Sequence, residues 1–384
     1  MFSMFTKRNL IRSSDRQPSF ITFLSTKAGL MFRRTSIKML NCYVIAFILV
    51  FSPFIAISNA SAGDADPRYR NCVEQCEGSG CIGKRYFPNC KISADEVPVI
   101  GPPWGMVEPL YARWKKGHCK SNCQYYCMIN REKERELLNK DPEKYHGKWP
   151  FKRIYGIQDP ASMVFSSLNL VMHFHGWMSF FTLIYNKLPL KARKRPYYEY
   201  ASLWHIYGLL SLNSWFWSAI FHCRYCELIE KLDYFSAVAL LGYSLILAIL
   251  RSFNVKDEAT RVMIPAPLIS FVATHIMYLN FFKLDHEWSL KVCLAMTVAQ
   301  LATWAIWGGV SHHPSRWKLR FVVLISGLAM CLQIYDFPPY EGILDAQALR
   351  HAITVPLTYL WWSFIRDDAT FLTTERLKNS KKSK

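Results

Sequence analysis

Acidic residues are scarce in this 384-residue sequence. It contains 28 Asp and Glu residues against 47 Lys and Arg, a formal net charge of +19, and only 20% of its residues are charged whereas 51% are hydrophobic. A soluble enzyme of this size rarely combines so little charge with so much apolar and aromatic character. The G-x-S-x-G motif is also absent, so nothing indicates the nucleophile elbow of an α/β-hydrolase. The composition instead favours a membrane protein.

Long apolar stretches are abundant. Seven of them approach the roughly 17–25 residues that a helix needs to cross a bilayer. Any one alone could be a buried core helix, but seven in succession, joined by short loops, favour membrane spans. They cover residues 161–185, 199–221, 233–252, 262–282, 289–308, 319–336 and 347–366.

A secretory signal peptide is indicated before these stretches. The apolar run 43–57 follows basic residues and leads to the small residues Ala60–Ala62, which is typical of a signal sequence and its cleavage site. The basic, Ser-rich residues before it fit either a transit-like segment or an over-extended N-terminus, and we favour the second because Met31 and Met39 offer later starts. We assign residues 1–62 to the signal peptide with this over-extension.

The basic residues predict the orientation of the chain. If cleavage leaves the new N-terminus in the lumen, seven crossings place the first, third and fifth loops and the C-terminal tail in the cytosol. These loops are the basic ones, as the positive-inside rule requires. This orientation accounts for the positive charge, so we do not predict nucleic-acid binding. The basic residues concerned are Lys187, Lys191, Arg193, Lys194, Arg195, Arg251, Lys256, Arg261, Arg316, Lys318 and Arg320.

The C-terminal tail carries a dilysine pattern. Lys381 and Lys382 stand fourth and third from the end of the sequence. In a cytosolic tail this spacing matches the signal that a coat receptor uses for retrieval to the endoplasmic reticulum. We therefore predict a multi-pass protein of the endoplasmic reticulum membrane, with cycling through the Golgi as an open alternative.

A cysteine-rich segment lies between the cleavage site and the first span. In a cytosolic protein its spacing would suggest a metal site, but the oxidising lumen favours disulfides. Because seven is odd, one cysteine needs an outside partner, for which Cys223 and Cys226 are candidates. The seven are Cys72, Cys76, Cys81, Cys90, Cys119, Cys123 and Cys127.

These observations together predict a fold class and its domains. We expect an all-α polytopic membrane protein, with seven transmembrane helices and an N-terminal disulfide-rich lumenal segment. The lumenal segment would cover residues 63–158, the transmembrane domain 159–368 and the cytosolic tail 369–384.

Polar side chains gather at the predicted lumenal ends of spans 2, 3 and 7. Ser218 and His222 lie one helical turn apart, as do Gln347 and His351, and Asp233 opens span 3. Ionisable groups inside a membrane are costly and often mark a functional cavity. The alternative is structural, with Ser218 bonded to its own helix, an interfacial His222 and Asp233 as a helix cap. An imidazole on span 2 with H-x3-H on span 7 would form a three-histidine zinc site, but Gln347 occupies the first of those positions.

At these residues the sequence resembles a known family. The spacing S-x3-H-x10-D at 218–233 and the polar face of span 7 are similar to the CREST superfamily of seven-span membrane hydrolases, which includes alkaline ceramidases and adiponectin receptors. Further motifs narrow the resemblance to the post-GPI attachment to proteins factor 3 family, over residues 63 to 370. They are the cysteine motifs at 66–81 and 119–128, QDPASMVFS at 158–166, FHCR at 221–224, KLDYF at 231–235, and DFPP at 336–339 through DAQALRH at 345–351.

The resemblance implies an activity and roles for the site residues. The activity is hydrolysis of the sn-2 acyl ester in the glycerolipid of protein-attached GPI anchors, by a zinc-activated water at the lumenal membrane face. By position, His222 and His351 would ligate zinc, Ser218 would hold the water or the developing oxyanion, and Asp233 would transfer protons.

The sequence departs from the family pattern in span 7. Gln347 replaces a histidine, and Arg350 stands where an aromatic residue is usual. A neutral amide is a poorer zinc ligand than imidazole. Either Gln347 coordinates through its carbonyl oxygen, or Asp233 or Asp345 substitutes, or the protein has become a non-catalytic lumenal escort or receptor for GPI-anchored proteins. Because the other four site residues are retained, we predict the hydrolase and keep the escort as the alternative.

Overall fold

The computed structural model describes residues 62–87, 110–191, 196–255, 257–281 and 286–382. Nearly all of the predicted signal peptide, as well as Cys90 and the last two residues, lies outside these ranges. The described residues are mostly helical, and their one sheet is a short antiparallel hairpin of β1 (Cys81–Ile82) and β2 (Arg85–Tyr86).

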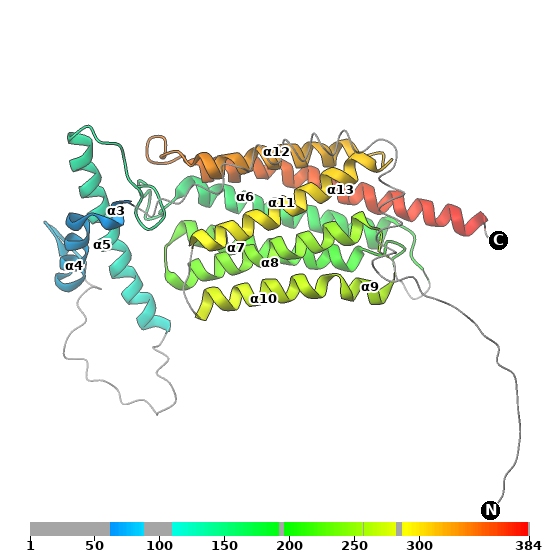
Figure 1. Cartoon of the computed structure of the whole chain (residues 1–384), viewed down its shortest axis with the longest axis horizontal. Helices are drawn as coiled ribbons and strands as arrows, with labels where there is room; N and C mark the ends of the chain where they lie inside the picture. The colour runs from blue at the N-terminus through cyan, green and yellow to red at the C-terminus, as the bar shows by residue number, and fades with distance from the viewer. Residues whose placement is uncertain (1–61, 88–109, 192–195, 256, 282–285, 383–384) are drawn as a thin grey trace, which may run out of the picture. The chain divides into compact units, whose positions relative to one another are not determined.

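An N-terminal helical unit precedes the apolar helices. It contains α3 (Ala62–Ala65), α4 (Pro67–Ser79) and α5 (Leu110–Leu137). Asp66 caps α4 by accepting a hydrogen bond from the Arg68 backbone N–H at 2.9 Å, and Gly80 ends the helix with a left-handed φ of 69°. Figure 1 shows α4 and α5 side by side.

Disulfides join α4 to α5. Cys72 pairs with Cys127 and Cys76 with Cys123, and the spacing of one helical turn on both helices places the two bridges one above the other. Cys119 is also disulfide-bonded. The cysteine left over within the described part is Cys81, whose thiol is free and exposed. The thiols of Cys223 and Cys226 are free too, so neither supplies the outside partner that the odd count led us to expect.

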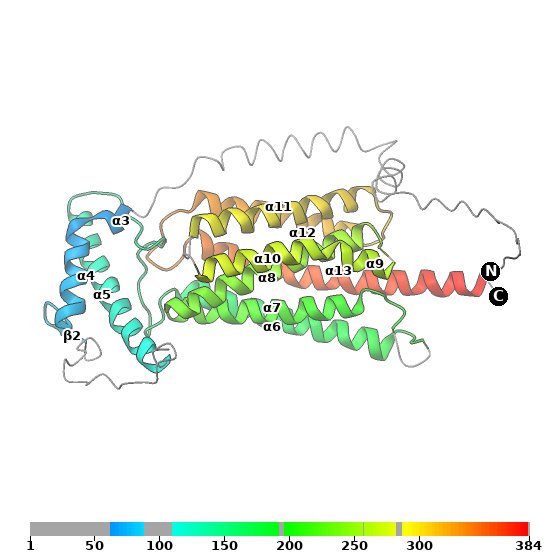
Figure 2. The ribbon, with the colours of Figure 1, turned by 60° about the horizontal axis from the view of Figure 1, so that its bottom comes forward.

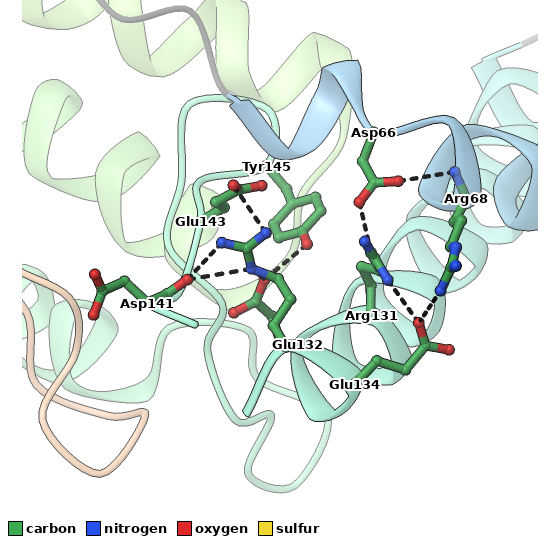
Figure 3. A network of polar contacts seen from close by, with 9 residues as sticks. Asp66, Arg68, Arg131, Glu132, Glu134, Asp141, Glu143 and Tyr145 are labelled. Atoms are coloured by element: carbon green, nitrogen blue, oxygen red, sulfur yellow. Dashed lines mark hydrogen bonds and ion pairs between the residues drawn. The ribbon is translucent and has the colours of Figure 1, made fainter. Parts of the chain in front are cut away.

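A charged network ties α5 to the start of α4 (Figure 3). The Asp66 carboxylate accepts a hydrogen bond from Arg131 Nε at 2.6 Å, and Arg131 also contacts Glu134 at 2.7 Å. Burial raises the pKa of Asp66, but the hydrogen bonds from Arg131 and from the Arg68 backbone outweigh it and hold the pKa below its usual value. At the other end, the Tyr145 hydroxyl donates to Glu132 at 2.7 Å.

We expect Cys76→Ala to destabilise this unit only moderately. With Cys72–Cys127 intact, the Cys76–Cys123 disulfide closes a loop of about ten residues. Removing this disulfide should lower the free energy of unfolding by about 2–3 kcal/mol. The melting temperature of the full-length protein and trypsin cleavage within residues 63–137 would report the change. Removing both bridges should cost clearly more than either alone, and equal single and double effects would contradict the argument.

Each of the seven predicted stretches coincides with one or two helices, apart from a few residues at the ends. These are α6 (Pro160–Thr182, continued by η2, Leu183–Lys187), α7 (Ala201–Cys223), α8 (Glu227–Ser252), α10 (Pro265–Phe281, preceded by α9, Glu258–Met263), α11 (His286–Val310), α12 (Arg316–Tyr335) and α13 (Ala346–Lys382). Contacts run from α6 to α7, α8, α11, α12, α13 and back to α6, which closes a ring, and α10 packs outside against α8. Figures 1 and 2 show these helices running alongside one another.

Three helical segments of the described chain are long and apolar enough to cross a membrane: Leu228–Ser252, Glu258–Phe281 and Trp288–Val310. Helices α6 and α7 are also long, but buried serine, asparagine and histidine side chains interrupt their apolar sequences, and α13 carries the buried His351, Thr358 and Asp368. Some of these side chains bond across helices, Ser166 to Ser218 and Asn169 to the His351 carbonyl, which offsets the cost of burying them.

Tight packing brings α6 and α13 together. A Cβ atom added at Gly176 on α6 would lie 2.3 Å from the Trp362 ring on α13, so only glycine allows this approach. Trp204, Trp304 and Trp362 are almost completely buried in the centre of the same bundle.

A buried carboxylate joins helices near the far end of α13. Asp368 accepts hydrogen bonds from Arg251 Nε at 2.8 Å and from the Tyr198 hydroxyl at 2.7 Å, and its Oδ1 lies 3.6 Å from His313 Nε2. Helix α13 continues past it without a break to Lys382, so the predicted tail from residue 369 extends the last helix and carries the exposed Lys381 and Lys382 at its end.

Candidate functional site

The structure brings together four predicted residues from two helices. Ser218 and His222 lie in the last turns of α7, and Gln347 and His351 in the first turns of α13. The rings of His222 and His351 lie 5.4 Å apart between centroids, and Gln347 Nε2 is 3.4 Å from His222 Nε2. Both imidazoles are buried.

A carboxylate that the sequence analysis did not single out holds His222. Asp159 occupies the N-cap position of α6, but its side chain makes no capping hydrogen bond. Its Oδ2 instead lies 3.1 Å from His222 Nδ1 and 3.5 Å from Lys148 Nζ. Burial raises the pKa of Asp159, but the charge of Lys148 and the hydrogen bond with His222 outweigh it and keep the pKa below its usual value.

The backbone explains why Asp159 reaches His222. The Asp159 N–H donates to the His222 carbonyl at 3.0 Å, so the chain entering α6 runs along the end of α7. In the sequence, Asp159 followed by Pro160 is indistinguishable from an ordinary helix start. The residue stood in a motif that carried the family resemblance, but only the tertiary contact reveals its partner.

Ser218 has a second serine beside it. Its Oγ lies 3.2 Å from the Oγ of Ser166 on α6, which is completely buried. On the same helix, Asn169 donates to the backbone carbonyl of His351 at 2.9 Å. Helix α6 therefore positions both α7 and α13, and isolated polar residues in an apolar stretch gave no signal of this.

The two imidazoles could hold a metal ion. With Nδ1 bonded to Asp159, His222 directs Nε2 toward Gln347, the arrangement in which a carboxylate orients a metal-ligating histidine. Neither ring nitrogen of His351 has a hydrogen-bond partner in the described part of the chain, although both are buried. These features fit two zinc ligands. The described residues contain no group of three or more His, Cys, Asp and Glu side chains placed to bind a metal. Gln347 approaches His222 through its amide nitrogen, so coordination by Gln347 would require its carbonyl oxygen in that place.

Comparison with known proteins places the chain in a family. Residues 109–369 match the model of the Per1-like family. The chain belongs to the Per1-like family. It is 32% identical over 329 residues to the "GPI-specific phospholipase A2-like PGAP3" of Xenopus laevis, covering 85% of this chain and 95% of that protein. The human protein of the same name is 30% identical, with 86% and 96% covered, and the "Protein PER1 homolog" of Schizosaccharomyces pombe is 30% identical, with 85% and 93% covered. No solved structure matches.

Asp233 lies in the second turn of α8 in this Per1-like protein, and its role in proton transfer stays a prediction. It lies on α8, where the charges of Lys148 and Arg350 act on it. Among the described residues its carboxylate makes no hydrogen bond or ion pair with Ser218, His222 or His351. The carboxylate in contact with His222 is that of Asp159.

A buried acid also begins α13 of this Per1-like chain. Asp345 Oδ1 accepts a hydrogen bond from the Ala348 backbone N–H at 2.7 Å and so caps the helix that carries His351. Burial raises the pKa of Asp345 to about 6.

We expect Asp345→Asn to stabilise the protein at neutral pH. The pKa of Asp345 is higher in the folded protein, about 6, than in the unfolded chain, about 4. The folded protein therefore has its full stability below about pH 4 and loses part of it as the pH rises through about 6 and the buried carboxyl ionises. Asparagine caps equally well without a charge to bury, so the variant should gain roughly 1–3 kcal/mol at pH 7 and nothing at pH 4. Melting temperatures of both proteins across this range test the prediction, and a gain that does not change with pH would contradict it.

Proposed function

We propose that this Per1-like protein remodels the lipid of GPI-anchored proteins, by hydrolysing the sn-2 acyl ester of the GPI glycerolipid at the lumenal face of the endoplasmic reticulum membrane. The observation that carries the proposal is the buried contact of Asp159, His222 and His351 where α6, α7 and α13 meet. The names of the relatives, GPI-specific phospholipase A2-like proteins, support the substrate class. In this proposal α6, α7, α8, α10, α11, α12 and α13 are seven transmembrane helices.

Each residue has a chemical role in this proposal. Asp159 accepts a hydrogen bond from the Nδ1–H of His222 and fixes the orientation of its ring, so that Nε2 stays available. Ser218, with Ser166 beside it, donates a hydrogen bond to the oxyanion that develops on the ester carbonyl. We retain Asp233 as the group that accepts and returns protons, within the positive field of Arg350.

Zinc fits this arrangement as a proposed cofactor. His222, His351 and the carbonyl oxygen of Gln347 are the residues that would hold it. When bound, zinc supplies Lewis-acid polarisation of the ester and a water of lowered pKa, which removes the need for a serine nucleophile.

An apolar groove lies next to the serine pair. It is lined by Leu170, Val171 and Phe174 of α6 and by Leu212, Asn213 and Phe216 of α7. Leu170 is one helical turn from Ser166, and Val171, Phe174 and Phe216 are about half exposed, so the groove opens on the outer surface of α6 and α7. Its apolar wall suits the acyl chain of the substrate.

Two features support the proposed location. The exposed Lys381 and Lys382 stand at the end of α13, where they would engage a retrieval coat in the cytosol. The bonded cysteines of α4 and α5 fit an oxidising lumen.

The alternative is a non-catalytic escort for GPI-anchored proteins, which the replacement by Gln347 favours. Zinc content and acyl release, measured together on the purified wild-type protein and on Gln347→His, separate the two functions. We expect near-unit zinc and release of fatty acid from a GPI-anchored protein by the wild-type protein, and tighter zinc binding by the variant because imidazole is the better ligand. Zinc and activity that appear only in Gln347→His would instead make the natural protein an escort.

A further inference from the structure

A polar and aromatic cavity lies directly beside the candidate site. The cavity is lined by residues of α5, by the chain that leads into α6, by Tyr69 of α4 and by Tyr225. Its wall includes Asp159 and the cations Lys148 and Arg153. Because Asp159 holds His222, a molecule bound in this cavity would lie next to the proposed catalytic residues.

Arg153 is a partly buried cation with no opposing carboxylate in contact. Its terminal nitrogens donate to Asn122 Oδ1 at 2.8 Å and to the Ser121 carbonyl at 3.1 Å, both neutral acceptors. Its Nε is buried and has no hydrogen-bond acceptor, and no carboxylate of the described ranges forms an ion pair with it. Burial lowers the pKa of Arg153, and the charge of Asp159, which makes no ion pair with it, does not outweigh that effect. An anion in the cavity would compensate this charge.

Three aromatic residues of the wall have polar atoms that are already hydrogen-bonded, and the partner of Tyr69 is His146 of the same wall. The Tyr69 hydroxyl lies 3.0 Å from His146 Nε2, the Tyr145 hydroxyl donates to Glu132, and Trp149 Nε1 donates to Asp336 at 3.0 Å. These side chains therefore present mainly ring carbon to the cavity. Ring carbon suits the C–H faces of a polyol ring, whereas Arg153 suits a phosphodiester.

We propose that this cavity binds the phosphoinositol part of the lipid headgroup, with Arg153 at the phosphodiester and the aromatic side chains against the inositol ring. The proposal rests on the proposed function, because it names the headgroup that would bring the ester to His222. Lys148, whose Nζ is 3.5 Å from Asp159 Oδ2, links the headgroup cavity to the candidate site.

Binding of glycerophosphoinositol to the full-length protein in detergent tests this proposal. We expect Arg153→Gln to weaken binding by roughly 10- to 100-fold, because a charge-assisted hydrogen bond is lost. Gln124→Trp should abolish binding by filling the cavity from α5, at a side chain that makes no hydrogen bond among the described residues. Lys120→Gln removes a charge from an exposed position of the same helix and should change nothing. Melting temperatures establish that each variant is folded. If Arg153→Gln does not fold, the loss of binding in Gln124→Trp tests the proposal in its place.

Two results would overturn the proposal. One is binding that is the same in all variants, and the other is inorganic phosphate competing as well as glycerophosphoinositol, which would mean that the inositol ring is not recognised. If the binding pattern holds but acyl release is never observed, the proposed hydrolase activity fails and the headgroup site is supported. If acyl release is observed without this binding pattern, the hydrolase activity is supported and the headgroup site fails.

Discussion

Replacing His222 by alanine is expected to reduce acyl-ester hydrolysis by about 10²- to 10⁴-fold, the usual loss when a positioned acid–base or metal-binding group is removed. The imidazole is the only side chain of the site that contacts Asp159, Gln347 and His351 together in the described part of the chain. Release of fatty acid from a purified GPI-anchored protein, measured over time, gives the rate.

A matched control lies on the same helix. His205 is half-buried toward the other end of α7 and accepts a hydrogen bond from Trp177 Nε1 at 3.0 Å. His205→Ala should retain most activity, because it lies about 25 Å along the helix from His222. Asp159→Asn should lose roughly 10- to 100-fold, since the ring remains but its orientation weakens. Full activity in His222→Ala would exclude the proposed site.

Replacing Asp368 by alanine is expected to lower the stability of the helical bundle by about 3–5 kcal/mol. The change removes the acceptor of Arg251 and Tyr198 and leaves a buried guanidinium without its carboxylate. These partners lie on α8 and on the loop before α7, so the variant loosens the ends of three helices together. A fall in melting temperature of the detergent-purified protein measures the effect.

The neighbouring acid provides the control. Asp367 contacts Lys318 Nζ at 2.7 Å with about a third of its side chain exposed, and exposed ion pairs contribute little, typically about 0–1 kcal/mol. Asp367→Ala should therefore be nearly neutral. Because Asp368 is about 25 Å along α13 from His351, activity per folded molecule should be unchanged. If Asp367→Ala and Asp368→Ala lower the stability equally, the burial of Asp368 does not explain its contribution to stability.

The helices of the bundle follow hydropathy closely. The predicted stretch 161–185 corresponds to α6 at 160–182, and 289–308 to α11 at 286–310. The prediction was least accurate at polar ends. Helix α8 begins at Glu227 rather than near Asp233, and α13 continues to Lys382. Charged residues near a span end lower hydropathy without breaking a helix, so the apolar pattern marks a span but not the full helix.

The sequence by itself determined the helical class, the seven apolar stretches, the cysteine-rich segment and the pairs Ser218–His222 and Gln347–His351. These features depend on local periodicity and composition, which need no knowledge of partners. Only the tertiary structure decided that Asp159 holds His222 and that Ser166 lies beside Ser218. It also decided that Arg153 faces a cavity and that no carboxylate of the described residues contacts Arg153. Each of these depends on which helices are neighbours, and a polar residue in an apolar helix gives no indication of the side chain that it will contact.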